Sequence, residues 1–177
     1  MDIAIVGKNS LKIKGKQITF IVDPTPDMPK TSADAIILLN GVSPPAGGNI
    51  DTSKVTDSRI TINGAGGYEV GGVKISTAKT PKGILYSLSI DDVSVILGSA
   101  TDAKIEGFNA CSVAVINADN DFNESFVTAL EPKITVLYGE KKIEAAKAIG
   151  AENISSVSKI TITKDKLPEK MEIVVLG

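Results

Sequence analysis

Residues 64 to 75, Gly64-Ala65-Gly66-Gly67-Tyr68-Glu69-Val70-Gly71-Gly72-Val73-Lys74-Ile75, decide the fold class of this chain. Apolar and polar residues alternate on both sides of the Gly71-Gly72 pair, which is the pattern of two short, half-buried strands. A two-residue hairpin turn requires positive φ angles, and glycine adopts them without steric cost. The stretch therefore predicts a β-hairpin formed by residues 68–70 and 73–75.

The composition favours a sheet protein. The 177 residues are expected to form one domain, 1–177, which is long enough to bury about 70% of the unfolded surface without disulfides. Aromatic residues make up only 4% of the chain and tryptophan is absent, so the core must be aliphatic. Isoleucine, valine and threonine are frequent, and these β-branched residues favour sheets over helical bundles.

Strand patterns continue along most of the chain. The predicted strands, besides the central hairpin, are 2–6, 11–14, 17–22, 33–39, 59–62, 84–90, 93–97, 112–116, 133–138, 159–163 and 172–176. Two helices are predicted, one over 122–130 with an Asp121 and Glu124 capping box, and one over 141–149 that ends at Gly150. Residues 40–58 form the longest irregular segment, and loops of this length commonly carry function.

Charge and cysteine content exclude several classes of partner. The formal net charge is −2, from 19 basic and 21 acidic residues, so bulk charge draws the chain neither to nucleic acid nor to an anionic membrane. No apolar run approaches the roughly 18 residues of a membrane-spanning helix. Cys111, the only cysteine, lies in an apolar run and is expected to be a buried, unreactive thiol. We expect a reducing, cytoplasmic location.

The chain contains no histidine. Histidine is the usual general base of nucleophilic triads and the commonest zinc ligand, so every histidine-based triad, dyad and zinc site is excluded. With a single cysteine in addition, one chain cannot build a closed zinc site from Cys and His.

Several segments, in order, resemble one protein family. The central hairpin is similar to the Gly-Glu-Tyr-Glu-Val-Gly-Gly-Val hairpin of small members of the metallo-β-lactamase-fold superfamily, the ascorbate-lactonase-like Zn-dependent hydrolases. Ile21-Val22-Asp23-Pro24 resembles the family's "Ile-Asp-Pro", and Ala33-Asp34 followed by residues 36–39 resembles the strand before its metal motif. Residues 130–136 and 159–176 are similar to later strands of the family. The resemblance covers nearly the whole chain.

The resemblance implies an α+β fold, the four-layer αββα sandwich of the metallo-β-lactamase type. In this arrangement two mainly antiparallel and mixed sheets pack face to face, with helices on the outside. Because few helices are predicted here, and those are short, we expect thin outer layers.

The same resemblance places the family's metal ligands on residues that cannot replace them. Lys8 stands where the family often has histidine, and the His-x-His-x-Asp-His motif falls on residues 40–45, beginning at Asn40. The metal-bridging aspartate falls on Ser99, and the last histidine falls near Gly139. The family layout would also bring Lys8, Asp23 and Asn40 to the mouth of the old site, where a Lys8–Asp23 ion pair could fill the place of the metal.

Other sites are weaker alternatives. Asp119-Asn120-Asp121 with Glu124 superficially resembles a calcium loop, but the later glycine and the bidentate glutamate of such loops are absent. The glycine clusters lack the spacing of phosphate-binding loops, and turn formation explains them.

We therefore expect a metal-free, non-catalytic member of the fold, acting as a binding or structural protein. The expected binding residues are those of the vacated metal cleft, Lys8, Asp23, Asn40, Ser99 and Gly139, with no catalytic residue, metal ligand or cofactor. The partner is expected to be a small molecule or a protein, and a homo-oligomer is an alternative. A hydrolase related to the Zn-dependent family, with an unrecognised or carboxylate-based site, remains the alternative function.

Overall fold

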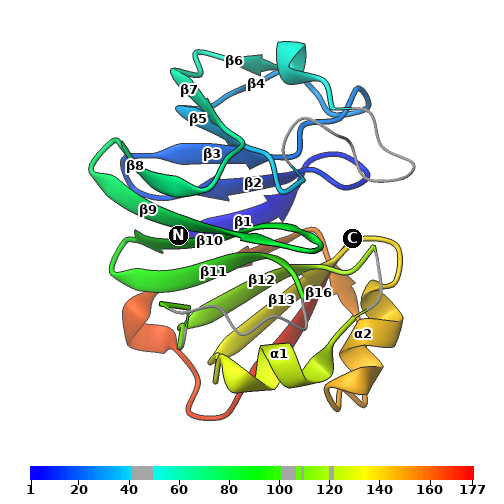
Figure 1. The fold of residues 1–177 in the computed structure, drawn as a ribbon. Helices are drawn as coiled ribbons and strands as arrows, with labels where there is room; N and C mark the ends of the chain where they lie inside the picture. The colour runs from blue at the N-terminus through cyan, green and yellow to red at the C-terminus, as the bar shows by residue number, and fades with distance from the viewer. Residues whose placement is uncertain (41–49, 101–106, 109, 120–121) are drawn as a thin grey trace.

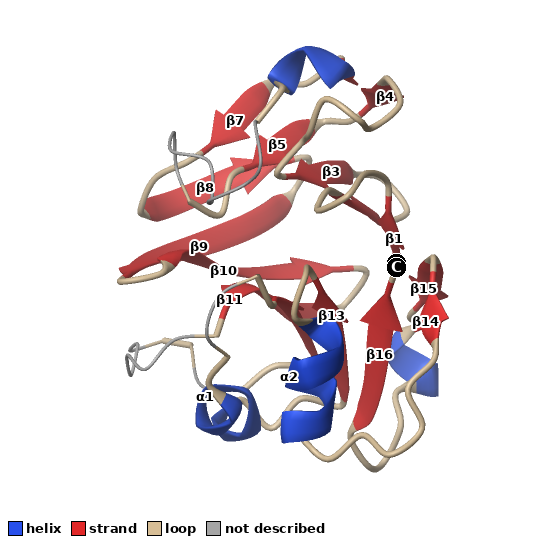
Figure 2. Ribbon diagram, turned by 90° about the vertical axis from the view of Figure 1, so that its right-hand side faces the viewer, coloured by secondary structure: helices blue, strands red, loops and turns tan. Residues whose placement is uncertain are grey.

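Two β-sheets pack face to face in the computed structural model of the chain (Figures 1 and 2), which describes residues 1–40, 50–100, 107–108, 110–119 and 122–177. The first sheet has the strand order β15-β1-β2-β3-β5-β7. Its strands are β1 (Asp2–Ile5), β2 (Leu11–Lys14), β3 (Thr19–Val22), β5 (Ala35–Ile37), β7 (Ile60–Ile62) and β15 (Lys159–Thr161).

The second sheet has the order β14-β16-β13-β12-β11-β10-β9-β8. Its strands are β8 (Gly66–Val70), β9 (Val73–Thr80), β10 (Gly83–Ile90), β11 (Val93–Ser99), β12 (Val113–Asn117), β13 (Ile134–Tyr138), β14 (Ser156–Val157) and β16 (Glu172–Leu176). The strands β8 to β11 form antiparallel hairpins, whereas β11, β12, β13 and β16 run parallel. The predicted hairpin is confirmed: Gly71 and Gly72 have φ of 56° and 79° and connect β8 to β9.

The main core lies between the two sheets and is almost entirely aliphatic, as the composition predicts. Alternate residues of each strand enter it, such as Ile13 and Phe20 of the first sheet and Val95 and Val115 of the second, all with no exposed surface. Burial of these side chains against one another fixes which face of each strand points inward, because a shift of one residue would turn the apolar set outward.

The two outer layers differ from each other. Helices α1 (Glu124–Ala129) and α2 (Lys142–Ala148) cover the outer face of the second sheet, where they form a separate apolar cluster with it (Figure 2). The outer face of the first sheet carries a two-stranded ribbon, β4 (Thr31–Ser32) with β6 (Val55–Thr56), and the 3₁₀ helix η1 (Thr52–Lys54), at the top of Figure 1. A second 3₁₀ helix, η2 (Lys164–Lys166), precedes the last strand. The expected thin outer layers are present.

The helix ends follow local sequence signals. The first helix begins two residues later than predicted. Asn123 is its N-cap, with Oδ1 accepting from Phe126 N at 3.2 Å, so the assignment of the cap to Asp121 is wrong. The second helix ends as predicted at Gly150, which has φ of 92° and closes a Schellman motif with Ala151. No helix in the described part of the chain is long and apolar enough to cross a membrane.

Parallel strands give the sandwich one edge where many carboxyl ends meet. The strands β11, β12 and β13 of the second sheet end there, and Asp23 and Asn40 follow the parallel strands β3 and β5 of the first sheet. In sheets of this kind the edge at the carboxyl ends is where ligands usually bind. We call this edge the carboxyl edge.

Candidate functional site

A row of polar side chains from three neighbouring strands closes the core at the carboxyl edge. Ser99 pairs with Asn117 across β11 and β12, and Asn117 pairs with Tyr138 across β12 and β13. Each lies two residues after a core residue of its strand, so its side chain points into the space between the sheets. Ser99 and Asn117 are about nine-tenths buried, and Tyr138 has no exposed surface. We call these three residues the polar row.

Asp23 is the first sheet's contribution to the site. It follows β3 with φ of 43°, and its Oδ1 accepts a hydrogen bond from Leu39 N at 2.9 Å. The neighbouring turn holds the segment in place, because the buried Ser10 Oγ donates to the Asp23 carbonyl oxygen at 2.8 Å. Only 4% of Asp23 is exposed. Burial raises the pKa of this carboxyl to about 7; the Leu39 hydrogen bond opposes the rise and the nearby Asp119 carboxylate adds to it.

Asp119 is the centre of a hydrogen-bond network that joins the two sheets. Its Oδ2 accepts from Asn9 Nδ2 at 2.9 Å and from Asn117 Nδ2 at 3.1 Å, and its Oδ1 accepts from Glu140 N at 2.7 Å. Asn9 belongs to the turn between β1 and β2 of the first sheet, whereas Asn117 ends β12 and Glu140 follows β13 of the second sheet. Both carboxylate oxygens are thus already occupied by protein donors.

Gly139 allows this network to form. Its φ is 103°, and a Cβ on it would lie 2.6 Å from Asp119 Oδ1 and 3.1 Å from Asp119 N. A side chain at position 139 would therefore push Asp119 away from Glu140 N. The family resemblance places the last histidine near Gly139, and the Asp119 carboxylate fills the space that a side chain at position 139 would enter.

Lys8 lies at the mouth of the site but does not pair with Asp23, so the prediction of a Lys8–Asp23 ion pair is wrong. Lys8 Nζ is 3.0 Å from Glu140 Oε1, and both side chains are mostly exposed. The hydrogen bonds and charge of Glu140 raise the pKa of Lys8. Asp23 is too deeply buried for the exposed lysine to reach it, because bringing the ammonium group inside would cost its hydration.

Asn40 follows β5 at the same edge, half-buried next to Gly83. A Cβ on Gly83 would meet the Leu39 carbonyl oxygen and lie 2.5 Å from Asn40 Oδ1, so glycine is needed there. The rest of the segment that would carry the family's metal motif, 41–45, lies outside the described residues. So do residues 120 and 121 of the candidate calcium cluster, of which Asp119 and Glu124 are described.

The structure gathers the five predicted site positions at the carboxyl edge, although they come from both sheets. Sequence reasoning missed Asn9, Asn117 and Tyr138. Strand alternation alone would have placed Asn117 and Tyr138 on the inner face, but their alignment with Ser99 depends on the register of parallel strands, which has no local sequence signal.

Two buried tyrosines at this edge, Tyr86 and Tyr138, differ in the hydrogen bonds that their hydroxyl groups make. The Tyr86 hydroxyl donates to the Leu38 carbonyl oxygen at 2.6 Å and lies 3.1 Å from that of Ile62. The Tyr138 hydroxyl makes no hydrogen bond to any described residue, although the Asn117 amide lies beside it. Burial raises the pKa of Tyr138 well above its ordinary value, and the negative charge of Asp23 acts in the same direction.

The Tyr138→Phe and Tyr86→Phe variants should therefore differ in stability. Tyr138→Phe is expected to lower the free energy of unfolding by no more than about 0.5 kcal/mol, and it could raise it, because no hydrogen bond is lost. Tyr86→Phe should lower it by about 1–2 kcal/mol, since the buried Leu38 carbonyl oxygen loses the hydroxyl that donates to it. Urea denaturation of both variants measures the difference. A clear loss of stability in Tyr138→Phe would mean that its hydroxyl has a partner in the folded protein.

The donor set of the carboxyl edge does not fit a zinc ion. Zinc sites in proteins use histidine, cysteine and carboxylate ligands. The described residues of the edge offer amides, hydroxyls and the carboxylates of Asp23 and Asp119, while the exposed Glu140 pairs with Lys8 at the mouth. Asp119 already accepts three hydrogen bonds, and Asp23 accepts one from the backbone. Among the described residues, no group of three or more His, Cys, Asp or Glu side chains could hold a metal ion.

Several solved structures share this fold. A candidate Zn-dependent hydrolase of the metallo-β-lactamase superfamily from Thermotoga maritima is 18% identical, with a TM-score of 0.75 over 99% of this chain and 98% of that chain. A diphosphatase from the PhnP family is 15% identical, with a TM-score of 0.54 over 97% and 82%. Zn²⁺-bound PqqB from Methylobacterium extorquens is 10% identical, with a TM-score of 0.57 over 92% and 100%.

These likenesses confirm the metallo-β-lactamase fold that the sequence resemblance implies. No family model matches the sequence, and no curated protein matches it. Because fold alone does not determine activity, the function must be argued from the residues at the carboxyl edge.

Proposed function

We propose that this chain is a metal-independent member of the metallo-β-lactamase fold that acts by binding and not by catalysis. The binding surface would be the carboxyl edge, formed by Lys8, Asp23, Asn40, Ser99 and Gly139 together with the polar row. The ligand would be a small molecule or a protein segment that offers hydrogen-bonding groups to the polar row. A cytoplasmic location is part of the proposal. Cys111 is a free, buried cysteine, and burial raises the pKa of its thiol to about 11, which agrees with an unreactive thiol.

One observation carries the proposal: the Asp119 carboxylate already accepts three hydrogen bonds from protein donors. Its bonds to Asn9, Asn117 and Glu140 N hold the two sheets together at this edge. A residue that ligates a metal must keep its lone pairs free for it, and ligating carboxylates in enzymes are held by a surrounding hydrogen-bond shell. In this chain the Asp119 carboxylate joins the two sheets, and no histidine is present that such a hydrogen-bond shell could orient toward a metal.

The alternative, a hydrolase with a carboxylate-based site, is favoured by a different observation. A carboxyl with a pKa of about 7, such as Asp23, is suited to general acid–base catalysis at neutral pH. Asp23 is only 4% exposed, however, and its Oδ1 already accepts from the backbone. Access to a substrate would require the edge to open, so we place this function second.

A structural homo-oligomer is the remaining form of the proposal. Ile60, on the edge strand β7, is one of the three large apolar side chains that are exposed among the described residues. The edge of a sheet offers unpaired backbone groups that a second copy could use. A sizing column at dilute concentration separates a monomeric binding protein from an obligate oligomer.

The test of metal independence is elemental mass spectrometry on untagged protein, because a histidine tag would add the ligands that the chain lacks. We expect less than about a tenth of an equivalent of zinc, manganese or iron, since stable zinc sites need a full set of protein ligands. Incubation with a chelator, or with added zinc, should leave the thermal midpoint unchanged, because a ligand that binds only the folded state would raise it.

The matched comparison is the Asp119→Asn variant measured in the same way. If Asp119 only holds the edge together, the variant should lose stability equally with and without metal. A stoichiometric metal in the wild type that disappears in Asp119→Asn would contradict the proposal and support the carboxylate-based hydrolase.

A further inference from the structure

One of the edge strands of the two large sheets differs from the others in the part of the chain that the structure describes. The edge strands β7, β14 and β15 contain three, two and three residues, whereas β8 contains five. Short edge strands, and lysine or proline on an edge, keep a sheet from pairing with another chain. The sequence of β8, Gly66-Gly67-Tyr68-Glu69-Val70, has neither lysine nor proline. It is therefore the edge to which a further strand can best be added.

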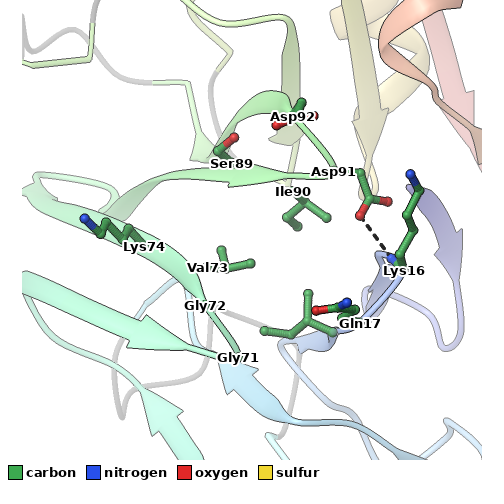
Figure 3. Close-up of a pocket in the computed structure, with 11 residues that line it drawn as sticks. Lys16, Gln17, Gly71, Gly72, Val73, Lys74, Ser89, Ile90, Asp91 and Asp92 are labelled. Atoms are coloured by element: carbon green, nitrogen blue, oxygen red, sulfur yellow. Dashed lines mark hydrogen bonds between the residues drawn. The ribbon is translucent and has the colours of Figure 1, made fainter.

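The backbone of β8 offers two residues to such a strand. The Gly71-Gly72 turn (Figure 3) connects β8 to β9 with two residues, which makes Val70 and Val73 a hydrogen-bonded pair. Hydrogen bonding alternates along an antiparallel ladder, so the N–H and C=O groups of Gly67 and Glu69 point away from β9. Outside the ladder, the backbone of these two residues bonds to no described residue, and both residues are exposed.

The two faces of β8 differ in character. Val73 packs against the main core, so the adjacent Lys74 lies on the outer face of the sheet, and Glu69 is opposite Lys74 in the ladder. Gly67 shares this outer face with Glu69, whereas Tyr68 is on the inner face, half-buried against the core. A Cβ built on Gly67 would meet no atom within 4 Å. The space beside this glycine is therefore open.

A second copy of β8, running antiparallel, fits this edge in one register. The register places Tyr68 opposite Tyr68 of the second copy, where the two rings form an aromatic pair across the ladder. Gly67 of each copy then lies opposite Glu69 of the other, and these two residues exchange their outward hydrogen bonds. One step along, Gly66 lies opposite Val70, so each longer side chain faces a glycine. A register that placed Glu69 opposite Glu69 would bring like charges together.

An exposed apolar side chain lies on the same side of the sandwich. Residues 63–65 join β7 to β8, so the last strands of the two sheets are neighbours there. Ile60 of β7 pairs with the core residue Ala35, and its side chain therefore points toward the second sheet, yet 37% of Ile60 is exposed. A copy paired along β8 would extend the second sheet past this isoleucine and cover it.

We propose that the chain forms a two-fold symmetric dimer in which β8 pairs antiparallel with β8 of a second copy. Each copy offers one β8, so the pairing closes at two copies and does not continue into a fibre. The inference rests on the homo-oligomeric form of the proposed function and gives it a defined surface, which is separate from the carboxyl edge. Dimerisation and ligand binding can therefore fail independently. Because the contact is one strand pair with its flanking side chains, we expect a weak dimer that depends on concentration.

The experiment is sedimentation velocity of untagged protein from about 5 to about 500 μM, a range suited to a weak association. We expect a monomer–dimer equilibrium with no larger species. Amide hydrogen exchange at both ends of the range locates the interface. The Gly67 and Glu69 amides should gain protection as the concentration rises, whereas the Tyr68 and Val70 amides are already bonded to β9. A protein that stays monomeric over the whole range would overturn the proposal and leave the edge to a strand of another protein.

Two variants at position 67 test the register, and both should fold because the space there is open. Gly67→Glu places a carboxylate opposite Glu69 of the other copy, and the two-fold axis repeats the repulsion, so dimerisation should weaken by at least about tenfold. Gly67→Lys adds a side chain of similar length with the opposite charge and should keep or tighten the dimer. Equal dimerisation of the two variants would refute this register.

The control for position is Val157→Glu. It places the same charge on β14, at the opposite edge of the second sheet, where Val157 is exposed. Dimerisation of this variant should match that of the wild type. If Val157→Glu weakens the dimer as much as Gly67→Glu does, the interface is not at β8.

Discussion

The Asp23→Asn variant is expected to lose much of the pH dependence of the protein's stability between pH 5 and pH 8. The folded state raises the pKa of Asp23 from about 4 to about 7, chiefly by burying the carboxyl. A shift of this size corresponds to at most about 4 kcal/mol of free energy of unfolding. Allowing for relaxation around a buried charge, we expect a change of about 2–3 kcal/mol.

The sign follows from proton binding. Between the unfolded and folded pKa values, the folded state holds a proton on Asp23 that the unfolded state has released. The contribution of this group to stability is therefore fully present below about pH 4 and is lost as the pH rises through 7. Asparagine cannot ionise, yet its side-chain oxygen can still accept from Leu39 N and it tolerates the positive φ of position 23.

The measurement is urea denaturation of wild type and Asp23→Asn at pH 5 and pH 8, with the difference between the two pH values compared. Asp34→Asn is the matched control, since Asp34 also accepts a backbone hydrogen bond, from Thr19 N at 2.8 Å. It should keep the wild-type pH dependence. Asp23→Ala should be less stable than Asp23→Asn at both pH values, because Leu39 N loses its acceptor. An unchanged pH dependence in Asp23→Asn would show that Asp23 ionises normally in the folded protein.

The Gly139→Ala variant is expected to be destabilised by about 3 kcal/mol or more. An L residue at φ of 103° costs about 1–2 kcal/mol by itself. The new Cβ would also lie 2.6 Å from Asp119 Oδ1. Asp119 cannot turn aside freely, because Glu140 N, Asn9 and Asn117 all hold its carboxylate. The network that joins the sheets at the carboxyl edge would therefore be disrupted.

The chain supplies a matched control for the cost of placing an L residue at a positive φ. Gly150 has a similar φ of 92°, but a Cβ there would meet no atom within 4 Å. Gly150→Ala should thus cost only the conformational penalty of about 1 kcal/mol. Chemical denaturation of both variants isolates the crowding at Asp119. If the two variants lose the same stability, the Asp119 network contributes little to holding the edge together.

Much of the fold could be predicted because its signals are local. The Gly71-Gly72 turn, the alternation of apolar residues in β9 to β11 and the C-terminal glycine of α2 each depend on a few neighbouring residues. The ribbon of β4 and β6 could not be predicted in this way. Its strands are two residues long, and they pair because Val55 and Met28 cover the outward-facing Ile21 and Ile36 of the first sheet.

The site could be predicted only in outline. The resemblance placed Lys8, Asp23, Asn40, Ser99 and Gly139 at one edge, which is where the structure has them. The interaction partners of Lys8 and Asp23 could not be predicted, because they depend on how deeply each side chain is buried. Lys8 remains hydrated and pairs with Glu140, whereas Asp23 is buried and accepts a backbone hydrogen bond.

The pairing of β1 with β15 has a consequence for how the chain folds. Asp2 lies opposite Thr161, and the segment that contains β14, β15 and β16 contributes strands to both sheets. Neither sheet can be completed until β15 and β16 are available, and contacts over such long sequence separations form slowly. We therefore expect the nascent protein to expose the unpaired edge of β1 until β15 has been synthesised, a stage in which chaperones would protect it from aggregation.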